Sequence, residues 1–260
     1  MATSRSAAYP WVFVTMLLAA WATSTAVGAV DPLILPRPWK VVSALPEMVR
    51  HGGFIRDVMA TLRRVAAAIL IAVAMGIPTG LYLGYRREVY RVVEGPLHAL
   101  RSVPASALFP LLLLITGVGE SSIILLAAYP STLVVIVNAV TGASLANRRR
   151  LHQARLLGLR PFEIVAEVLI FEAMPSIADG VRTAISYSLV LVVAVEMFIG
   201  VGEFGLGRAI YNYQSTYRIP ETYAAILIAG LLGVMLNFGL NRAERSLLVW
   251  IPERRDEQPA

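Results

Sequence analysis

An apolar run fills residues 121–143, which read SSIILLAAYPSTLVVIVNAVTGA, without one charged side chain. A helix needs about 20 consecutive apolar residues to cross the hydrocarbon core of a bilayer, and this run is long enough. A second uncharged apolar run extends from Ile185 to Val195. Two such runs in one chain predict a protein that spans a membrane.

The composition of the whole chain agrees with that prediction. Of its 260 residues, 57% are hydrophobic and 15% are charged, and the mean hydropathy is +0.66. Soluble domains carry about 25% charged residues, so this chain has too little charge to cover a surface that faces water. The net charge of +6 would indicate a nucleic-acid partner only if the basic residues formed one patch on a folded surface. They lie between the apolar runs instead, so no nucleic acid is expected.

Six segments of the chain are predicted to span the membrane as helices, within a single all-α domain that covers residues 1–260. They are residues 11–30, 58–84, 98–117, 121–143, 178–200 and 222–242. The third segment has the weakest signal, because Pro104 and Pro110 interrupt it. The first segment is longer than the apolar part of a typical signal peptide, so we expect it to remain as the first helix.

The positions of the basic residues predict the orientation of the spans. Cytoplasmic loops of membrane proteins carry the excess of Lys and Arg. With the N-terminus inside, the inner pieces hold fourteen arginines and the outer pieces hold six basic residues. Both termini are therefore predicted to be cytoplasmic.

Two outer segments have more structure than a simple loop. Within residues 31–57, apolar residues at helical spacing predict a short helix along the membrane surface; they are Val41, Val42, Leu45, Met48 and Val49. Residues 201–221 contain three glycines (Gly202, Gly205 and Gly207) followed by three tyrosines (Tyr211, Tyr213 and Tyr217). The tyrosines fit either an interfacial aromatic belt or a surface that receives a partner.

The longest inner connection contains a helix, a glycine break and a second helix over residues 148–163. Leu151, Ala154 and Leu157 form an apolar stripe framed by arginines, and Gly158 follows where a helix would end. Pro161 then opens the second helix. Such an element fits a basic helix that lies on anionic lipid. It also fits a helix that a soluble partner binds and moves, so that the attached membrane helices move with it.

This inner segment resembles the cytoplasmic "EAA" motif of permease subunits in ATP-binding-cassette (ABC) importers. The matching residues are His152-Gln153-Ala154, then Gly158, and later Ala173-Met174-Pro175 with Ile177. Further similarity lies in Leu35-Pro36-Arg37-Pro38, Arg101-Ser102-Val103-Pro104, Phe109-Pro110-Leu111-Leu112, Gly117-Val118-Gly119-Glu120, Val195-Glu196-Met197 and Gly205-Leu206-Gly207. Together these segments are similar to the nitrate, sulfonate and taurine branch of the family.

The motif is not complete. His152 and Gln153 replace the usual Glu and first Ala, Phe171 stands where the first Pro is usual, and Glu172 stands where a small residue is usual. Gly158 and Pro175 are kept. The resemblance implies a type I (MetI-like) importer permease fold, with a coupling helix that contacts an ATPase through Leu151, His152, Gln153, Ala154, Arg155, Leu157, Gly158 and Pro161.

The resemblance also implies partners and a location. The partners are a second copy of the permease, two ATP-binding subunits on the cytoplasmic face and an extracytoplasmic solute-binding protein, in a bacterial inner membrane. The implied cargo is a small solute, anionic or sulfonate-like. The rival hypothesis is a stand-alone channel or an ion-driven secondary transporter, which usually shows midplane charges or internal repeats.

The chemistry of the chain argues against an enzyme. No phosphate-binding G-x-x-x-x-G-K-[ST] loop is present, and the sole lysine is Lys40, so ATP and Mg are expected on the partner ATPase. No cofactor, catalytic residue or metal site is expected. The three histidines, His51, His98 and His152, lie far apart, and cysteine is absent.

Glu196 is the charged residue in the spans that points to function. It lies four residues from the outer end of its apolar run, about 6 Å below the boundary at 1.5 Å per residue. A carboxylate there either reaches the outer headgroups or faces the bundle interior. In the second case we expect it to line the translocation pathway or its outer gate, and to hold the gate closed by pairing with an arginine or with backbone amides. Near the inner end of the same span, Asp179 and Arg182 are expected to form a local pair.

Overall fold

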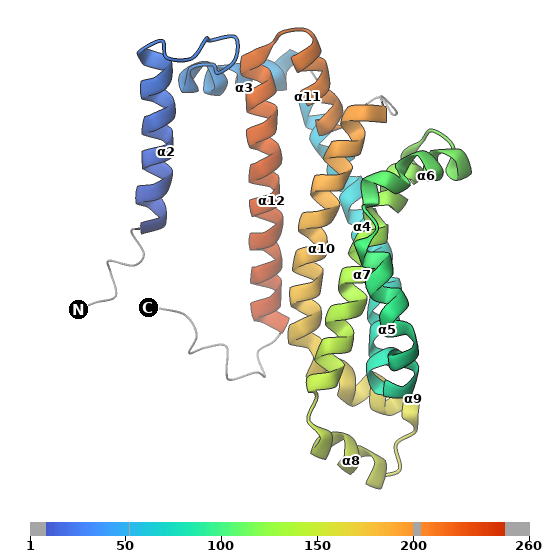
Figure 1. The fold of residues 1–260 in the computed structure, drawn as a ribbon. Helices are drawn as coiled ribbons and strands as arrows, with labels where there is room; N and C mark the ends of the chain where they lie inside the picture. The colour runs from blue at the N-terminus through green and yellow to red at the C-terminus, as the bar shows by residue number, and fades with distance from the viewer. Residues whose placement is uncertain (1–8, 52, 200–203, 248–260) are drawn as a thin grey trace, which may run out of the picture.

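The computed structural model describes residues 9–51, 53–199 and 204–247 (Figure 1). Within these ranges, every regular element is a helix. The elements are α2 (Tyr9–Ala26), α3 (Pro38–His51), α4 (Phe54–Tyr85), α5 (Arg87–Ser102), η1 (Ala105–Leu108), α6 (Phe109–Thr116), α7 (Glu120–Leu145), α8 (Arg148–Leu156), α9 (Pro161–Glu163), the π-helical turn η2 (Ile164–Leu169), α10 (Ile170–Ile199), α11 (Leu206–Ser215) and α12 (Ile219–Leu247). The predicted all-α fold class is confirmed.

Four helices in the described ranges are long and apolar enough to cross a membrane. They are Phe54–Tyr85, Glu120–Leu145, Pro161–Phe198 and Ile219–Glu244. They correspond to the second, fourth, fifth and sixth predicted spans. The fifth begins earlier than predicted, because the helix that opens at Pro161 continues through Pro175 without a break. A proline inside a packed bundle is tolerated when neighbouring groups satisfy the freed carbonyl.

The third predicted span, 98–117, is wrong as a single helix. The chain forms α5 and then η1 with α6, two pieces that meet at an angle of 83°. The bend lies at Val103 and Pro104, where Val103 is extended (φ −72°, ψ 119°), because a proline disfavours the helical conformation of the residue before it. As a result α6 leaves the bundle sideways (Figure 1).

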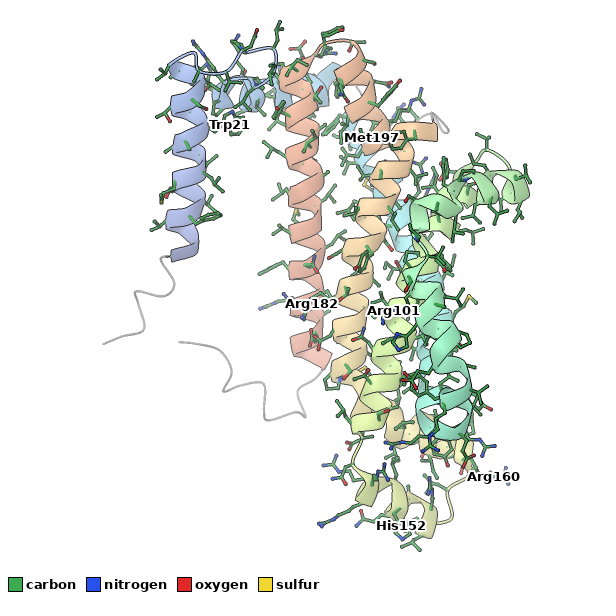
Figure 2. All side chains as sticks on the ribbon, in the orientation of Figure 1. Trp21, Arg101, His152, Arg160, Arg182 and Met197 are labelled. Atoms are coloured by element: carbon green, nitrogen blue, oxygen red, sulfur yellow. The ribbon has the colours of Figure 1, made fainter. Side chains whose placement is uncertain are left out.

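The first predicted span, 11–30, is the helix α2, whose apolar part Val12–Ala26 is shorter than a full span. The helix ends at Ala26, and Gly28 then takes a left-handed conformation with φ +75°. In Figure 1 most of α2 is separated from α12, but near the end of α2 the rings of Trp21 and of Tyr223 on α12 lie 6.4 Å apart. The indole of Trp21, labelled in Figure 2, donates a hydrogen bond to the Pro36 carbonyl at 2.9 Å.

The centre of the molecule is the packing of α4, α7 and α10. Small residues bring α4 and α7 close together: a Cβ added at Gly76 would lie 2.8 Å from Val135, and one at Gly80 would lie 2.5 Å from Ala139. Close approach through small residues drives helix association in lipid, where apolar burial gives little advantage. The close packing of α4, α7 and α10 fixes where the residues at the two ends of these helices lie.

The surface helix predicted within residues 31–57 is present as α3. Of the five residues that the spacing indicated, Val41 and Met48 are buried and Leu45 is partly buried, in a cluster with residues of α11 and α12. Val42 and Val49 are exposed, so the predicted apolar face is confirmed only in part. Of the three tyrosines, Tyr213 is buried, whereas Tyr211 and Tyr217 are exposed. Gly202 lies outside the described residues.

Candidate functional site

The inner segment forms the predicted helix, glycine break and second helix. The side chain of Asn147 caps α8 by accepting a hydrogen bond from the Arg149 amide at 2.9 Å. At the other end Gly158 adopts φ +84°, its amide donates to the Arg155 carbonyl at 3.0 Å, and the Leu159 amide donates to the Ala154 carbonyl at 3.2 Å. This pair of bonds is a Schellman motif, in which glycine is favoured because L side chains are strained at positive φ.

The second helix leads directly into a membrane span. Pro161 occupies its first position, and the Glu163 carboxylate accepts a hydrogen bond from the Arg160 amide at 2.6 Å. After α9 the chain passes through the π-helical turn η2 and continues into α10. The helix that opens at Pro161 therefore runs without a break to the opposite end of the bundle.

The turn between the two helices exposes an apolar surface at the end of the molecule. Leu156, Leu157 and Phe162 are 74%, 80% and 80% exposed. Exposed apolar clusters of this kind mark sites of protein interaction when polar residues surround them, and His152 and Arg160 lie nearby (Figure 2). We call Leu156, Leu157 and Phe162 the inner apolar surface.

The residues predicted to contact an ATPase form two groups: some pack against the bundle, and the others are exposed. Ala154 is buried and Leu151 packs against the core cluster that contains Leu169 and Ala173. The other six residues are all exposed. Two of them, His152 and Arg155, line a hollow between α8 and the bundle. The remaining four do not line it: Gln153, Leu157, Gly158 and Pro161. The structure thus distinguishes an anchoring face from an outward face, a distinction that the sequence pattern did not make.

The departure from the motif at Glu172 has a structural explanation. Its carboxylate forms an ion pair with Arg150 and accepts a hydrogen bond from the Asn147 amide at 3.3 Å. The carboxylate on α10 therefore fastens the start of α8 to the bundle.

The outer end of the bundle holds an ion cluster of Arg64, Glu196 and Glu120, of which Arg64 and Glu196 are buried. Arg64 is 1% exposed and Glu196 is 2% exposed, and their side chains meet with Nη1 to Oε1 at 2.6 Å. The other side of the Arg64 guanidinium binds Glu120, with Nε to Oε2 at 2.9 Å. One arginine on α4 thus joins α10 to the start of α7. Two hydrogen-bonded carboxylates provide the compensation that a buried charge requires.

The same cluster receives the start of α11. The amides of Gly205, Leu206 and Gly207 donate to Asp57, Thr61 and Glu196, each at 2.9 Å. These amides are unpaired within the helix and carry its partial positive charge, so carboxylates are favoured there. The glycines permit this close approach, because a Cβ on Gly205 would lie 2.7 Å from Arg64 Nη1.

The predicted pairing of Glu196 with an arginine and with a backbone amide is therefore present. Arg64, Thr61, Asp57 and Glu120 were not predicted as members of this site. A signal for Arg64 existed, since a charge within the apolar segment 58–84 needs a partner just as Glu196 does. Thr61 and Asp57 carry no such signal, because only the packing of α11 gives them a role.

A hollow of about 600 Å³ opens beside the ion cluster. It is lined by Arg56, Met59, Ala60, Arg63, Arg64, Glu120 and Phe204. Arg63 is largely exposed, with its Nη2 lying 3.4 Å from Glu120, and the Arg56 guanidinium lies 5.6 Å from the Phe204 ring centre. The outer end of α4 thus presents two exposed guanidinium groups next to a buried one.

Three further ion pairs lie outside the ion cluster, and one of them joins two helices. Near the inner end of α10, Arg182 pairs with Asp179 at 3.2 Å, as predicted, and also with Glu244 of α12 (Figure 2). At the outer turn, Arg218 donates to Glu221 at 2.9 Å, which raises the pKa of the guanidinium. Burial raises the pKa of the neighbouring Tyr213 phenol. In the part of the chain that the structure describes, no group of three or more metal-binding side chains comes together.

Comparison with known proteins agrees with these features. Residues 76–247 match the model of a family described as the binding-protein-dependent transport system inner membrane component. A probable ABC transporter permease protein of Brucella melitensis is 30% identical over 88% of this chain and 92% of its own length. The taurine transport system permease protein of Escherichia coli is 27% identical, over 90% of this chain and 86% of its own length.

A nitrate permease and a solved transporter structure are also similar to this chain. The nitrate import permease protein of a Synechocystis strain is 27% identical over 70% of this chain and 65% of its own length. In a structure of the MetNI methionine ABC transporter in inward-facing conformations, the matched chain has a TM-score of 0.64, with 22% identity over 74% of this chain and 94% of that chain. That likeness confirms the expected MetI-like fold. The chain belongs to the family of binding-protein-dependent inner membrane components, the transmembrane subunits of ABC importers.

Proposed function

We propose that this chain forms the translocation pathway for a small anion and is driven by separate ATPase subunits that dock on the inner apolar surface. The observation that carries the proposal is the position of Leu156, Leu157 and Phe162. They are exposed on a turn that α8 anchors on one side and that runs into the spanning helix α10 on the other. Movement of a docked partner is thereby transmitted to the bundle.

The complex that this function requires contains two copies of the permease, two ATPase subunits on the inner side and a solute-binding protein on the outer side. ATP and Mg would bind only to the ATPase subunits. Both termini would lie in the cytoplasm, which agrees with the arginines around α8. In this orientation α3, α11 and the turn before α12 face outward, where a solute-binding protein would dock.

An anionic cargo is supported by both the relatives and the outer hollow. The relatives include permeases named for taurine and for nitrate. Arg56 and Arg63 line the outer hollow and are both exposed, and guanidinium groups are suited to sulfonate-like and nitrate-like oxyanions. The positive charge at the entrance would raise the local concentration of such a solute.

Glu196 and Arg64 would act as an outer latch rather than as a cargo site. A carboxylate repels an anion, but its bonds to Arg64, Thr61 and Gly207 hold α10, α4 and α11 together. We expect opening of the outer side to rearrange this cluster. The energy would come from the tighter binding of ATP to the outward-facing state.

The docking surface can be tested by co-purification of the ATPase subunit with the permease from membranes. We expect Leu157→Asp to abolish co-purification, because a charge would be buried in an apolar contact. Leu157→Met should retain it, because the exposed apolar surface is kept. Retention of the ATPase by a folded Leu157→Asp variant would refute the proposed docking surface.

The rival hypothesis is tested by transport in liposomes. We expect the permease alone to give no taurine or nitrate uptake, and the complex with its ATPase and binding protein to give uptake that depends on ATP. Uptake by the chain alone, driven by an ion gradient, would instead establish a channel or secondary transporter.

A further inference from the structure

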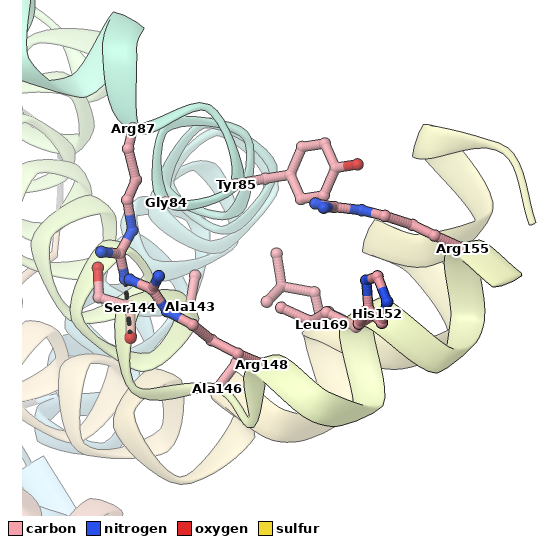
Figure 3. A pocket seen from close by; sticks show the side chains of 11 residues that line it. Gly84, Tyr85, Arg87, Ala143, Ser144, Ala146, Arg148, His152, Arg155 and Leu169 are labelled. Carbon is pink, nitrogen blue, oxygen red and sulfur yellow. Dashed lines mark hydrogen bonds between the residues drawn. The ribbon is translucent and has the colours of Figure 1, made fainter.

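A second hollow lies at the inner end of the molecule, between α8 and the ends of α4 and α7 (Figure 3). Its volume is about 400 Å³. The lining comprises Gly84, Tyr85, Arg87, Ala143, Ser144, Ala146, Arg148, Leu151, His152, Arg155 and Leu169. The walls therefore come from the membrane bundle on one side and from the coupling helix α8 on the other.

Three guanidinium groups from two separate helices line this hollow. Arg87 begins α5, whereas Arg148 and Arg155 lie at opposite ends of α8. In Figure 3 the side chains of Arg87 and Arg148 run toward one another beside Ser144, and Arg155 extends over Tyr85. The Arg87 Nη2 donates to the Ser144 carbonyl at 3.2 Å, and the Arg155 guanidinium lies 5.7 Å from the Tyr85 ring centre.

No carboxylate balances these charges at the hollow. None of its eleven lining residues, all of them in the described part of the chain, is Asp or Glu. None of the ion pairs found among the described residues involves Arg87, Arg148 or Arg155 either. Like charges around one cavity repel, and an anion between them removes the repulsion.

The outer hollow provides a contrast within the same molecule. There the Glu120 carboxylate forms ion pairs with Arg63 and Arg64, whereas the lining of the inner hollow contains no carboxylate. The general excess of arginine on cytoplasmic sides explains why basic residues occur near α8. It does not explain why three of them line one cavity together with the Tyr85 side chain and an exposed serine.

The position of the inner hollow along α4 corresponds to the inner headgroup region of a bilayer. At 1.5 Å per residue, Gly84 lies roughly 30 Å from Arg63 along α4, which equals the thickness of the hydrocarbon core. If the exposed Arg63 marks the outer boundary, the inner hollow lies at the opposite boundary. There both soluble anions and lipid phosphates are within reach.

We propose that this inner hollow binds a phosphate-type oxyanion, supplied either as free phosphate or as the headgroup of an anionic lipid. Several guanidinium groups around one cavity match the oxygens of such an anion through charge-assisted hydrogen bonds. A bound anion would join Arg87 on the bundle to Arg148 and Arg155 on α8. It would thereby hold the coupling helix against the membrane domain, a role separate from transport of the cargo.

The test uses the full-length permease in nanodiscs of phosphatidylcholine, with binding of radiolabelled inorganic phosphate measured by equilibrium dialysis. We expect wild-type protein to bind phosphate, and Arg148→Gln with Arg155→Gln to weaken binding by about tenfold or more for each guanidinium removed. Arg87→Gln should also weaken binding, although it alters a different helix. Arg149→Gln is the matched control, because Arg149 adjoins Arg148 on α8 but does not line the hollow, and it should bind as wild type does.

A second arm distinguishes the two sources of the anion. If a lipid headgroup is the ligand, phosphatidylglycerol in the nanodiscs should displace phosphate, and native mass spectrometry should find this lipid retained by wild type but not by the double variant. If the ligand is free phosphate, its binding should persist in the presence of phosphatidylglycerol. The proposal is overturned if wild type binds neither phosphate nor the lipid, or if Arg149→Gln weakens binding as much as the double variant does.

Discussion

At the scale of single residues, two adjacent arginines on α4 have opposite environments. The Arg64 side chain is 1% exposed and bonded to two carboxylates, whereas the Arg63 side chain is 72% exposed and lies 3.4 Å from Glu120. Removal of one partner from a buried ion pair leaves an uncompensated charge. Exposed pairs contribute little because water and salt screen them. The same chemical substitution should therefore have very different effects at the two positions.

We expect Arg64→Gln to lower the free energy of unfolding by about 3–5 kcal/mol, because Glu196 would remain buried without its cation. Arg63→Gln should change it by less than about 1 kcal/mol. Denaturant titration of the purified permease in detergent micelles measures both values. Equal losses in the two variants would show that the ion cluster does not stabilise the outer end.

The close contact at Gly207 gives a second prediction for a single residue. A Cβ there would collide with the Val193 carbonyl oxygen and lie 2.8 Å from the Glu196 Cβ. We expect Gly207→Ala to destabilise the protein by about 1–3 kcal/mol through overpacking. Gly230→Ala is the control: nothing lies within 4 Å of its added Cβ, and alanine favours a helix more than glycine does. Thermal unfolding in detergent should separate the two variants, and a stable Gly207→Ala protein would contradict the packing.

At the scale of elements, the inner turn depends on how α8 ends. The Schellman motif at Gly158 ends α8 and turns the chain toward α9. The three residues of the inner apolar surface are exposed around this turn. The sequence predicted this arrangement well, because a glycine stop and a proline start are local signals. The bend of the third span was missed, although the local signal at Pro104 was available. The anchoring of α8 by Glu172 was also missed, because it depends on contact with another helix.

We expect Gly158→Ala to cost about 1–2 kcal/mol at the turn, since alanine is strained at φ +84°. The strain should displace the inner apolar surface and lower ATP-dependent uptake of the cargo in proteoliposomes. Gly95→Ala on α5 is the matched control, because its added Cβ meets nothing within 4 Å. Uptake by Gly158→Ala at the level of the control would argue that the turn geometry is not needed for coupling.

At the scale of the whole molecule, one continuous helix joins the two functional ends. Its helical run extends from Pro161 to Phe198 and carries Phe162 of the inner apolar surface at one end and Glu196 of the ion cluster near the other. At 1.5 Å per residue these two residues lie about 50 Å apart along the axis. A rigid element of this length can couple a partner at the inner side to a rearrangement at the outer side.

The orientation of the molecule can be tested with single cysteines, because the chain has no cysteine of its own. Leu157 is 80% exposed at the inner turn and Tyr217 is 82% exposed at the outer turn. In intact cells, a maleimide that does not cross membranes should label Tyr217→Cys but not Leu157→Cys. Permeabilised cells should show labelling of both. The reverse pattern in intact cells would place the arginine-rich side outside.

The sequence alone determined the class of the protein, the presence of four spans and the form of the inner turn. These features follow from hydrophobic runs, charge asymmetry and capping residues, all of which act over a few turns of chain. It also singled out Glu196 as a carboxylate that needs a partner. The partner itself, Arg64, lies 132 positions away, and only the packing of α4 against α10 selects it. The inner hollow was likewise decided by tertiary structure, because Arg87, Arg148 and Arg155 line one cavity only after α8 folds back beneath the bundle.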